Sequence, residues 1–383
     1  MNILFLADPG SVHDVKWMSY LSVGHTCHLI VRKHHAAQMG VEKLRAFERT
    51  NGIRIIAQVE DFSIRRFGQT WSTAKELARL IRANGIDVFH MMYAEPNALW
   101  AFFRRTLAVP ILLTTRGTDV LKTIPAFYQR KSLLDRSVAW CYWKALRQVD
   151  QVTCTSTRQS TAVKELSGDP QKAIELVRTG VPVQRILEDT TAHQLQDLNG
   201  QRYVLFPRSM RPIYQHELAL AAIDLLPENI LRDHLFVFVD RSSSYRDYVQ
   251  DVQRLIDRSK GRTLWLDHVD QPTMFQMYKR AALVAMTPIS DGSPVSALEA
   301  MLCKVPVILP PLRYDEDLFG AGIVQFKEWT AASLAGTMEA VLHGTLRPDV
   351  ESAYRTVLDR ADSQKEMEKV RSLYEEMSRK NRS

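Results

Sequence analysis

The most regular feature of the chain is a series of short apolar runs that alternate with stretches of helical periodicity. In the first half, runs short enough for buried strands cover residues 3–7, 27–31, 53–59, 86–90, 109–115 and 150–156. Residues 15–23 and 72–84 instead repeat apolar side chains at helical spacing, and Ala74, Leu77 and Ile81 mark the inner face of the second helix. Strands that alternate with helices predict βα units and a parallel sheet.

A second series of the same kind occupies the other half of the chain. Its apolar runs cover residues 203–206, 235–239, 263–266, 282–286 and 305–309, and helices are predicted over 245–258, 274–281 and 364–380. Residues 183–200 are polar, show no clear period and separate the two series. The pattern therefore predicts an α/β protein with two Rossmann-like βα-repeat domains, residues 1–182 and 201–363, joined by a linker over 183–200.

Composition agrees with globular domains and indicates a compartment. The 383 residues are 45% hydrophobic and 24% charged, which are ordinary values for folded proteins. The four cysteines (Cys27, Cys141, Cys154 and Cys303) show neither a C-x-x-C pair nor a metal-ligand spacing, so we expect them to be reduced. The first residues lack the basic region of a signal peptide, and no apolar run approaches the roughly 18 residues of a membrane span. We therefore expect a cytoplasmic protein.

Positive charge is concentrated in the first half. Residues 1–200 hold 26 Lys and Arg against 18 Asp and Glu, a net charge of +8, whereas the remainder carries −1. Within 122–147, six cations and five aromatic residues are interleaved: Lys122, Arg130, Lys131, Arg136, Lys144 and Arg147, with Phe127, Tyr128, Trp140, Tyr142 and Trp143. This pattern suits a peripheral site on an anionic membrane surface, and a core helix with a solvated basic face explains it as well. No nucleic-acid-binding module is present in the sequence, so we expect no nucleic-acid partner.

The stretch from residue 282 to 302 carries the clearest candidate chemistry. A predicted strand is followed by a polar turn over residues 290–293 and then by a helix, for which Ser293 is the expected N-cap and Pro294 the first residue. Two acids, Asp291 and Glu299, stand on either side of the helix N-terminus, whose free N–H groups suit a phosphate. Two solvated acids on an ordinary helix are the simpler alternative. A nucleotide-sugar has the matching layout, with phosphates in the middle and hydroxyls at both ends.

Residues 291–301, DGSPVSALEAM, resemble the acid-x7-Glu signature of the group 1 (family 4) glycosyltransferases, which are retaining, metal-independent enzymes of the GT-B fold. The resemblance implies two Rossmann-like domains that face each other across a cleft, with the C-terminal helix over 364–383 returning to the first domain. It implies that Asp291 lies near the transferred sugar and that Glu299 holds the ribose. The donor-binding residues that it adds here are Gly292, Ser293, Val295 and Ser296.

Other segments extend the resemblance. Arg208 follows the strand over 203–206, where the family has an Arg on the donor pyrophosphate, and a planar guanidinium suits paired phosphate oxygens. Arg211, Tyr214 and His216 are the candidates for the place of the family's second cation, a Lys that this chain lacks. His268 lies in a loop that flanks the nucleotide base in the family. The loop after the first strand is similar too, and it contributes Gly10 and Ser11 on the donor side and His13 on the acceptor or phosphate side.

The chain departs from the family pattern at two places. Where the family shows D-V-x-H-x-H, His90 matches the first His but Met92 replaces the second, so His90 is either a catalytic residue or a satisfied residue at a strand end. The segment Arg116-Gly117-Thr118-Asp119 resembles the family's H-G-x-D loop with Arg in place of His. Arg116 and Asp119 are thus candidates for the acceptor or phosphate side, and a plain turn is the alternative.

Together these observations predict a retaining, metal-independent glycosyltransferase of hexosyl or N-acetylhexosaminyl type. We expect a nucleotide-sugar donor, with a UDP-sugar favoured, no cofactor, and a glycan or lipid-linked acceptor in bacterial-type glycan, glycolipid or polysaccharide assembly. Two alternatives stay open at this point: a non-catalytic nucleotide-sugar-binding scaffold, and another GT-B enzyme such as a sugar-nucleotide epimerase or an inverting transferase.

Overall fold

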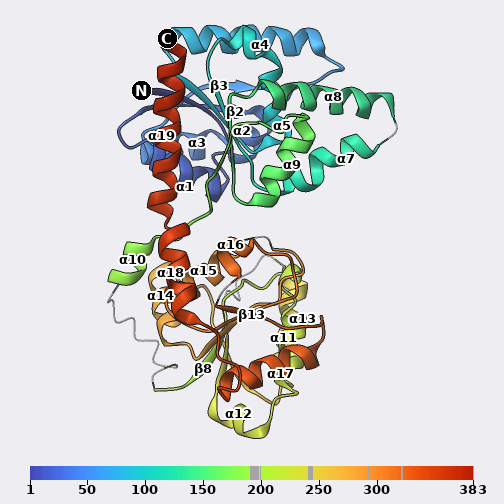
Figure 1. The fold of residues 1–383 in the computed structure, drawn as a ribbon, viewed down its shortest axis with the longest axis vertical. Coiled ribbons are helices and arrows are strands. Elements are labelled where there is room, and N and C mark those ends of the chain that lie inside the picture. Colours follow the sequence, from blue (N-terminus) through green and yellow to red (C-terminus); the bar gives the residue numbers. More distant parts are fainter. Residues whose placement is uncertain are drawn as a thin grey trace. The chain divides into compact units, whose positions relative to one another are not determined.

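A computed structural model gives the structure of residues 1–130, 132–189, 198, 200–239, 245–291, 293–320 and 322–382. The chain divides into two compact units: Met1–Arg178 together with Lys365–Ser383 form the first, and Thr179–Gln364 form the second. Each unit is a parallel β-sheet covered by helices (Figure 1), so the predicted α/β class with two βα-repeat domains is confirmed.

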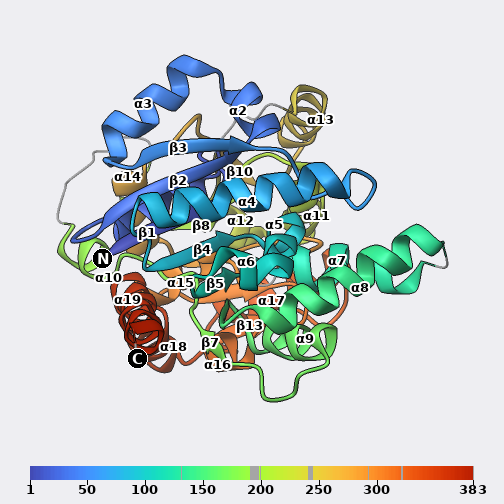
Figure 2. The ribbon, with the colours of Figure 1, turned by 90° about the horizontal axis from the view of Figure 1, so that it is seen from above.

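The sheet of the first unit has seven strands in the order β3-β2-β1-β4-β5-β6-β7, and all neighbours are parallel. The strands are β1 (Asn2–Leu6), β2 (Thr26–Arg32), β3 (Arg54–Val59), β4 (Val88–Met92), β5 (Ile111–Thr114), β6 (Gln151–Cys154) and β7 (Ile174–Leu176). Alternate residues point to opposite faces: Leu4 and Leu6 enter one core, and Ile3 and Phe5 enter another. Both faces are buried because helices pack on each of them (Figure 2).

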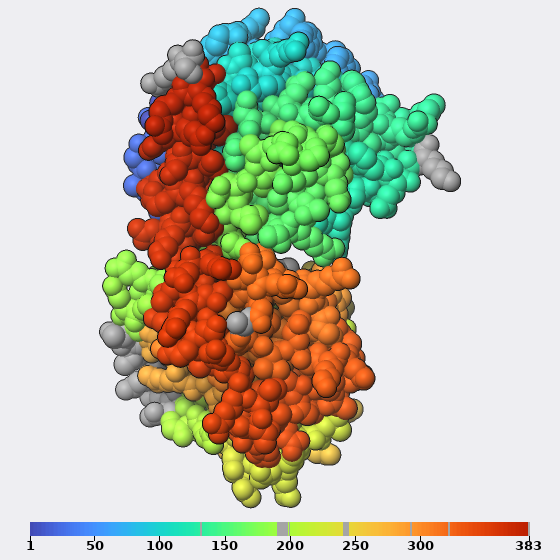
Figure 3. All heavy atoms as spheres, in the orientation of Figure 1, coloured from blue at the N-terminus to red at the C-terminus, as the bar shows by residue number. Residues whose placement is uncertain are grey.

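The helices of the first unit follow the strands in the usual βα order. They are α1 (Val12–Leu21), α2 (Lys33–Met39), α3 (Val41–Asn51), α4 (Phe67–Ala83), α5 (Ala94–Asn97), η1 (Ala98–Phe103), α6 (Arg104–Leu107), η2 (Asp119–Thr123), α7 (Ile124–Gln129), α8 (Leu133–Gln148) and α9 (Thr157–Ser167). The last helix, α19 (Ser363–Arg382), buries Met367, Val370 and Tyr374 in the same core as Ile3. The space-filling view shows α19, in red, along one side of this unit (Figure 3).

The second unit repeats the arrangement with six parallel strands in the order β10-β9-β8-β11-β12-β13. The strands are β8 (Tyr203–Phe206), β9 (Leu235–Phe238), β10 (Arg262–Trp265), β11 (Leu283–Ala285), β12 (Val307–Leu309) and β13 (Ile323–Gln325). The helices are α10 (Val183–Glu188), η4 (Pro212–Tyr214), α11 (His216–Ile223), α12 (Glu228–Asp233), α13 (Arg246–Ile256), α14 (Gln271–Arg280), α15 (Val295–Leu302), α16 (Glu316–Phe319), α17 (Ala331–Leu342) and α18 (Val350–Arg360). Two apolar cores again lie on opposite faces of the sheet.

Each sheet reverses its strand order at one place, between β1 and β4 in the first unit and between β8 and β11 in the second. At such a switch point the loops that follow two adjacent strands lead to opposite faces, and open α/β sheets bind ligands there. The loops after β8 and β11 are those that carry Arg208 and Asp291.

Several local predictions differ from the structure. The apolar pattern predicted no helix over α2 and α3, α9, or α17 and α18, and β4 ends at Met92, two residues beyond the run predicted over 86–90. The first six residues of the predicted 183–200 linker form α10, whose Val183 and Ile186 are buried in the core of the second unit. A polar composition concealed this helix because only two of its six side chains supply the apolar contact. Residues 190–197 and 199 lie outside the described part of the chain.

No helix in the described residues is both long and apolar enough to span a membrane.

Candidate functional site

Arg208 lies in the loop after β8, and a buried histidine fixes that loop. His216, in the first turn of α11, is 2% exposed, and its Nε2 lies 3.1 Å from the carbonyl oxygen of Arg208. Burial lowers the pKa of His216 to about 4, so the ring is neutral near pH 7 and Nε2–H donates to that carbonyl. The ring thus positions the backbone of Arg208. This placement differs from the donor contact expected for His216.

The guanidinium of Arg208 is the centre of a hydrogen-bonded group. Its Nη2 donates to the hydroxyl of Tyr214 at 2.6 Å and to Oδ2 of Asp291 at 3.1 Å, and its Nη1 lies 3.4 Å from Oγ of Ser296. The guanidinium carbon lies 4.2 Å from the centroid of the Tyr214 ring. The side chains of Arg208 and Asp291 are 20% and 15% exposed, so the ion pair is only partly screened by solvent. The structure thus brings together three residues that the sequence singled out: Arg208, Asp291 and Ser296.

Helix α15 begins one residue later than predicted. Pro294 is the N-cap, with an extended ψ of 108°, and Val295 is the first helical residue. Ser293 therefore stands one position too early to cap the helix, and its buried Oγ has no hydrogen-bond partner within the described residues. The first N–H groups of a helix have no acceptor inside it, so the N–H groups of Val295 and Ser296 are directed outward beside Arg208. Gly292, the remaining predicted donor contact in this loop, lies outside the described residues.

Glu299 lies about one turn after Ser296 in α15 and is 9% exposed. The hydroxyl of the fully buried Tyr278 interacts with both Ser296 and Glu299, and burial, with the charge of Glu299 as a second cause, raises the pKa of Tyr278 well above its usual value. Ser296 thus joins Arg208 to the Glu299 side of the helix. Sequence reasoning missed Tyr278, which comes from α14 and carries no local motif.

A second tyrosine missed by sequence reasoning borders the same group. The pKa of Tyr314 is raised, first by burial and then by the charge of Asp291, while Arg208 acts in the opposite direction. Its buried hydroxyl, like that of Ser293, makes no hydrogen bond within the described residues. Two buried hydroxyls near a cation and a helix N-terminus are the kind of polar atoms that a ligand satisfies.

His268 is not part of this group. It is exposed in the loop after β10, and β9 lies between β10 and the strand that carries Arg208. The predicted contact of His268 with the nucleotide base stays a prediction.

A second polar group lies in the first unit, around Arg116 in the loop after β5. Its Nη2 donates to Oδ1 of Asp14 at 3.0 Å, and its guanidinium carbon is 4.8 Å from the centroid of the Trp17 ring. Burial lowers the pKa of Arg116, and Asp14 opposes that shift by pairing with it. Sequence reasoning missed Asp14, which lies in the first turn of α1 and is 4% exposed.

Asp119 has no exposed surface and holds the surrounding backbone. Its carboxylate accepts hydrogen bonds from the backbone N–H groups of Ala94, Arg116, Gly117 and Val120 at 2.8–3.1 Å. Burial raises the pKa of Asp119, and these N–H groups oppose the rise. The carboxylate joins the loops after β4 and β5, so Asp119 acts on Arg116 through the backbone.

The loop after β1 and the first turn of α1 hold three further candidates of the first unit: Gly10, Ser11 and His13. Ser11 caps α1 by accepting from the N–H of Asp14, and the N–H of Gly10 donates to Asp8 at 2.9 Å. The pKa of His13 is lowered, first by partial desolvation and second by the charge of Arg116. Ser11 and His13 thus flank Asp14, the partner of Arg116.

His90 lies in the middle of β4 with no exposed surface. Its Nδ1 is 2.6 Å from the hydroxyl of Tyr374 in α19, and its Nε2 is 2.7 Å from Oγ1 of Thr114. Burial lowers the pKa of His90 to about 3, so the ring is neutral. This environment favours the structural alternative for His90, and Met92 is likewise a core residue, so we leave His90 out of the mechanism proposed below.

No group of three or more His, Cys, Asp and Glu side chains is placed to hold a metal ion in the part of the chain that the structure describes.

Two family models match the chain, one in each unit. Residues 2–156 match the model described as glycosyl transferase 4-like, and residues 189–349 match the model described as glycosyl transferases group 1. No curated protein matches the chain.

Solved structures resemble the chain over nearly its whole length. A glycosyltransferase from Rickettsia africae has a TM-score of 0.73 at 15% identity, and the match covers 98% of each chain. HepE from Anabaena, in complex with UDP, has a TM-score of 0.72 at 14% identity, covering 98% of this chain and 100% of that one. Sucrose-phosphate synthase from Thermosynechococcus elongatus has a TM-score of 0.66 at 15% identity, covering 98% and 99%.

The buried His216 predicts a pH dependence of stability. The unfolded imidazole titrates near its usual pKa of 6.5 and the folded one near 4, so between these values the unfolded state binds more protons. The contribution of neutral His216 to the free energy of unfolding is complete above about pH 6.5. It falls by on the order of 3 kcal/mol as the pH is lowered to about 4. Urea denaturation at several pH values in this range gives the free energy of unfolding as a function of pH. This free energy should change less steeply with pH for His216→Gln than for the wild type. The exposed control His268→Gln should keep the wild-type slope, and equal slopes for all three proteins would contradict the prediction.

Proposed function

Because the chain belongs to the group 1 glycosyltransferases and has the GT-B fold, we propose that it transfers a hexosyl or N-acetylhexosaminyl group from a nucleotide-sugar to an acceptor hydroxyl, with retention of anomeric configuration. The observation that carries this proposal is the group formed by Arg208, Asp291 and Ser296 at the N-terminus of α15.

The donor pyrophosphate binds at Arg208 in this proposal. A guanidinium has five N–H donors, and its contacts with Tyr214, Asp291 and Ser296 leave donors for phosphate oxygens. The N–H groups at the start of α15 and the hydroxyl of Ser293 add further donors on the same side. These groups stabilise negative charge on the leaving diphosphate, which is the role that a divalent cation plays in other transferases, and we therefore propose a metal-independent reaction without a cofactor.

Asp291 and Glu299 have different roles because they lie on different sides of the phosphate site. Asp291, held by Arg208 at 3.1 Å, positions the sugar and offsets positive charge at the anomeric carbon as the bond to phosphate breaks. Glu299, eight residues later and largely buried, accepts hydrogen bonds from the ribose hydroxyls. A UDP-sugar is the donor that we favour, and the UDP complex of HepE supports this choice.

In this scheme the anomeric configuration is retained because the acceptor hydroxyl attacks the same face of the sugar from which the diphosphate departs. The acceptor hydroxyl forms the new bond to the anomeric carbon while the bond to the diphosphate oxygen breaks, and the hydroxyl proton passes to a phosphate oxygen. The carboxylate of Asp291 is already engaged by Arg208, which makes it a poorer nucleophile and favours this front-face route over a covalent intermediate.

We assign the acceptor to the first unit, around Arg116. The Arg116–Asp14 pair, with His13 beside it, offers both a cation and a hydrogen-bond acceptor, and Asp119 fixes the loop that carries the cation. This chemistry suits the hydroxyls of a glycan or a phosphate that joins it to a lipid.

We further propose that the first unit docks on an anionic membrane that carries the acceptor. Helices α7 and α8 project from the body of this unit in both ribbon views (Figures 1 and 2). Leu133, Trp140 and Tyr128 expose 80%, 51% and 41% of their surface, whereas Tyr142 is buried at 1%. The basic and aromatic pattern of residues 122–147 is therefore divided between a core face and an exposed apolar face, and Lys131 lies outside the described residues. Exposed apolar side chains beside Arg130 and Arg136 suit the boundary between headgroups and acyl chains.

The first functional prediction concerns Arg208. Arg208→Ala should weaken UDP binding by about 1.5–3 kcal/mol, tenfold or more, because it removes hydrogen bonds to a charged group. Titration calorimetry with UDP measures this change. Arg232→Ala, which removes an exposed cation elsewhere in the second unit, is the matched control. An unchanged affinity of the Arg208 variant would transfer the phosphate role to another cation such as Arg211, and failure of UDP, GDP and ADP alike to bind would remove the donor proposal.

The second prediction separates the two acids. Glu299→Gln should chiefly raise the donor KM, because a ribose contact is similar in the ground and transition states. Asp291→Asn should chiefly lower kcat, because it acts where charge develops. Steady-state kinetics with the donor identified by UDP, GDP and ADP binding would show the split, with Asp257→Asn, an exposed acid at the end of α13, as the control. A loss confined to KM in both variants would refute the role given to Asp291.

The third prediction concerns the membrane. Each cation near an anionic leaflet contributes about 1 kcal/mol, so reversing two charges in Arg130→Glu/Arg136→Glu should reduce binding about tenfold or more. Flotation with vesicles of phosphatidylglycerol and phosphatidylcholine measures this, and high salt should have the same effect. Lys43→Glu/Arg45→Glu, a matched pair of exposed cations on α3, should float like the wild type. Equal recovery on neutral and anionic vesicles would favour an acceptor in solution.

A further inference from the structure

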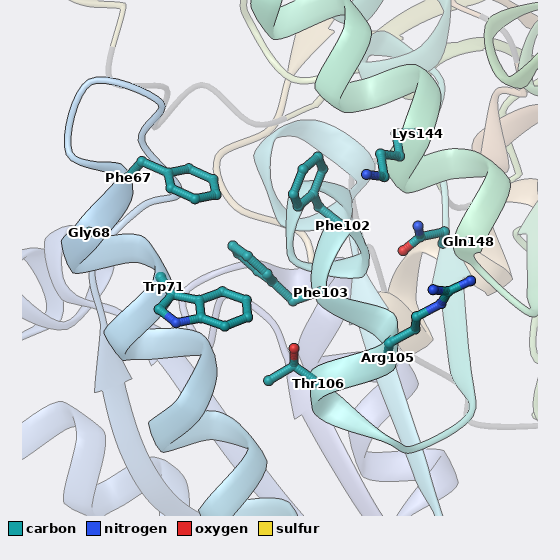
Figure 4. A pocket seen from close by; sticks show the side chains of 9 residues that line it. All are labelled: Phe67, Gly68, Trp71, Phe102, Phe103, Arg105, Thr106, Lys144 and Gln148. Atoms are coloured by element: carbon teal, nitrogen blue, oxygen red, sulfur yellow. The ribbon is translucent and has the colours of Figure 1, made fainter.

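A pocket of about 540 Å³ lies in the first unit. Its lining comes from four elements, α4, η1, α6 and α8, and consists of Phe67, Gly68, Trp71, Phe102, Phe103, Arg105, Thr106, Lys144 and Gln148 (Figure 4). Neither the donor site nor the Arg116 group uses any of these residues.

The walls of the pocket are aromatic and partly exposed. Phe67 and Trp71 are 45% and 38% exposed, and Figure 4 shows them facing Phe102 and Phe103. The ring centroids of Trp71 and Phe103 are 5.3 Å apart, and those of Phe67 and Phe102 are 6.3 Å apart. Trp140 continues this surface along α8, with its ring centroid 5.8 Å from that of Phe102. An exposed aromatic surface of this extent is typical of an interaction site.

Two cations line the pocket, and no acid does. The ammonium of Lys144 is 4.6 Å from the ring centroid of Phe102 and 5.1 Å from that of Trp140, so aromatic faces stabilise it, and no carboxylate of the described residues pairs with it. Arg105 is exposed on the same side of the pocket, with Gln148 between it and Lys144 (Figure 4), and the ammonium of Lys75 lies 5.4 Å from the ring centroid of Trp71. The pocket therefore selects for a ligand that has an apolar body and carries negative charge.

The small number of hydrogen-bonding groups in the pocket further restricts the class of ligand that it can bind. The neutral hydrogen-bonding groups among the lining side chains are Thr106, Gln148 and the indole N–H of Trp71, whereas a sugar or a nucleobase needs several directed partners. A hydrocarbon chain needs none. Lys144 also lies on the same helix as the exposed Leu133, eleven residues away, or about 16 Å along the axis. The pocket is thus continuous with the surface through which we propose that the first unit docks.

We propose that this pocket takes up one hydrocarbon chain of an anionic membrane phospholipid, with the chain against Phe67, Trp71, Phe102 and Phe103 and the phosphate at Lys144 and Arg105. The inference rests on the membrane docking proposed above and adds a specific lipid site to it. Docking on charge alone leaves the acyl chains in the bilayer, whereas a chain held in the pocket ties the first unit to one lipid molecule.

The experiment compares the full-length protein with paired variants on vesicles of phosphatidylglycerol and phosphatidylcholine. Phe67→Ser/Trp71→Ser should lower vesicle binding about tenfold, because these exposed rings lose their apolar contact with the chain. Leu225→Ser, which changes a residue of the second unit that is 58% exposed, should bind as the wild type does. Lys144→Glu/Arg105→Glu should remove the preference for phosphatidylglycerol, and Lys43→Glu/Arg45→Glu should keep it. Wild-type binding by the two pocket variants would overturn the proposal.

A second measurement locates the acyl chain of the bound lipid and does not depend on a loss of vesicle binding. Phosphatidylglycerol brominated on its acyl chain quenches nearby tryptophan, and two of the seven tryptophans, Trp71 and Trp140, border the pocket. Trp71→Phe keeps the pocket apolar, so it should still bind vesicles but lose the quenching that Trp71 contributes, while Trp140 on the docking surface is left unchanged. Quenching as strong as that of the wild type would show that the acyl chain lies outside the pocket and would overturn the proposal.

The two proposals are separated by a monomeric probe. Dodecyl phosphate in place of vesicles should bind the wild type and Arg130→Glu/Arg136→Glu equally, and should bind Phe67→Ser/Trp71→Ser at least about tenfold more weakly. Inorganic phosphate should not compete with it. If Arg130→Glu/Arg136→Glu still binds dodecyl phosphate but no longer floats with vesicles, the pocket is supported and docking is attributed to surface charge. Competition by inorganic phosphate at similar affinity would overturn a site built for the chain. All variants should bind UDP like the wild type, which reports on their folding and on the donor site independently.

Discussion

The parallel direction of every strand in both sheets is the constraint on which the candidate site depends. Parallel strands end at the same edge of a sheet, so the loops that follow them meet there although they are far apart in sequence. In the second unit β8 and β11 are neighbours, which brings Arg208 to within 3.1 Å of Asp291, 83 residues later. In the first unit the order β1-β4-β5 brings Arg116 to Asp14 and lets Asp119 hold the N–H of Ala94.

The two units use this geometry in a similar way and with different electrostatic results. In both, an arginine from a loop pairs with an aspartate that follows another strand and lies over an aromatic ring, Tyr214 in the second unit and Trp17 in the first. Arg208 and Asp291 stay partly exposed, so substrate can exchange for solvent there. Arg116 and Asp14 are more deeply buried, at 13% and 6% exposure, so breaking that pair leaves an uncompensated charge. Buried neutral histidines support the framework: His216 holds the Arg208 loop, and His90 joins β4 to α19.

The basic and aromatic segment of the first unit, residues 122–147, shows how folding divides one sequence pattern between two faces. Residues 122–147 mix cations with aromatic side chains, and folding sorts them: Tyr142 faces the core, whereas Trp140 and Leu133 face outward. The pocket beside them depends on Phe67 and Trp71 of α4, which are more than 60 residues away in sequence from Lys144. The cation–aromatic contacts of Lys144 keep a positive charge over an apolar floor without a carboxylate to neutralise it. A surface of this composition meets the needs of a lipid better than those of a sugar.

The sequence by itself determined the alternation of strands and helices, the division into two series and the residues of the α15 motif, because periodicity and turn chemistry are local properties. It placed Arg208, Asp291 and Ser296 in one site only through the family resemblance. It placed the N-cap of α15 one residue early and missed α10, since helix ends and small apolar faces depend on neighbouring packing. Tyr278, Tyr314 and Asp14 were beyond its reach, as were the hydrogen-bond partners of His90, the burial of His216 and the aromatic pocket, because each depends on which strands are adjacent and which helices cover them. Only the tertiary structure decides those contacts, since residues far apart in the chain have no local signal of their proximity.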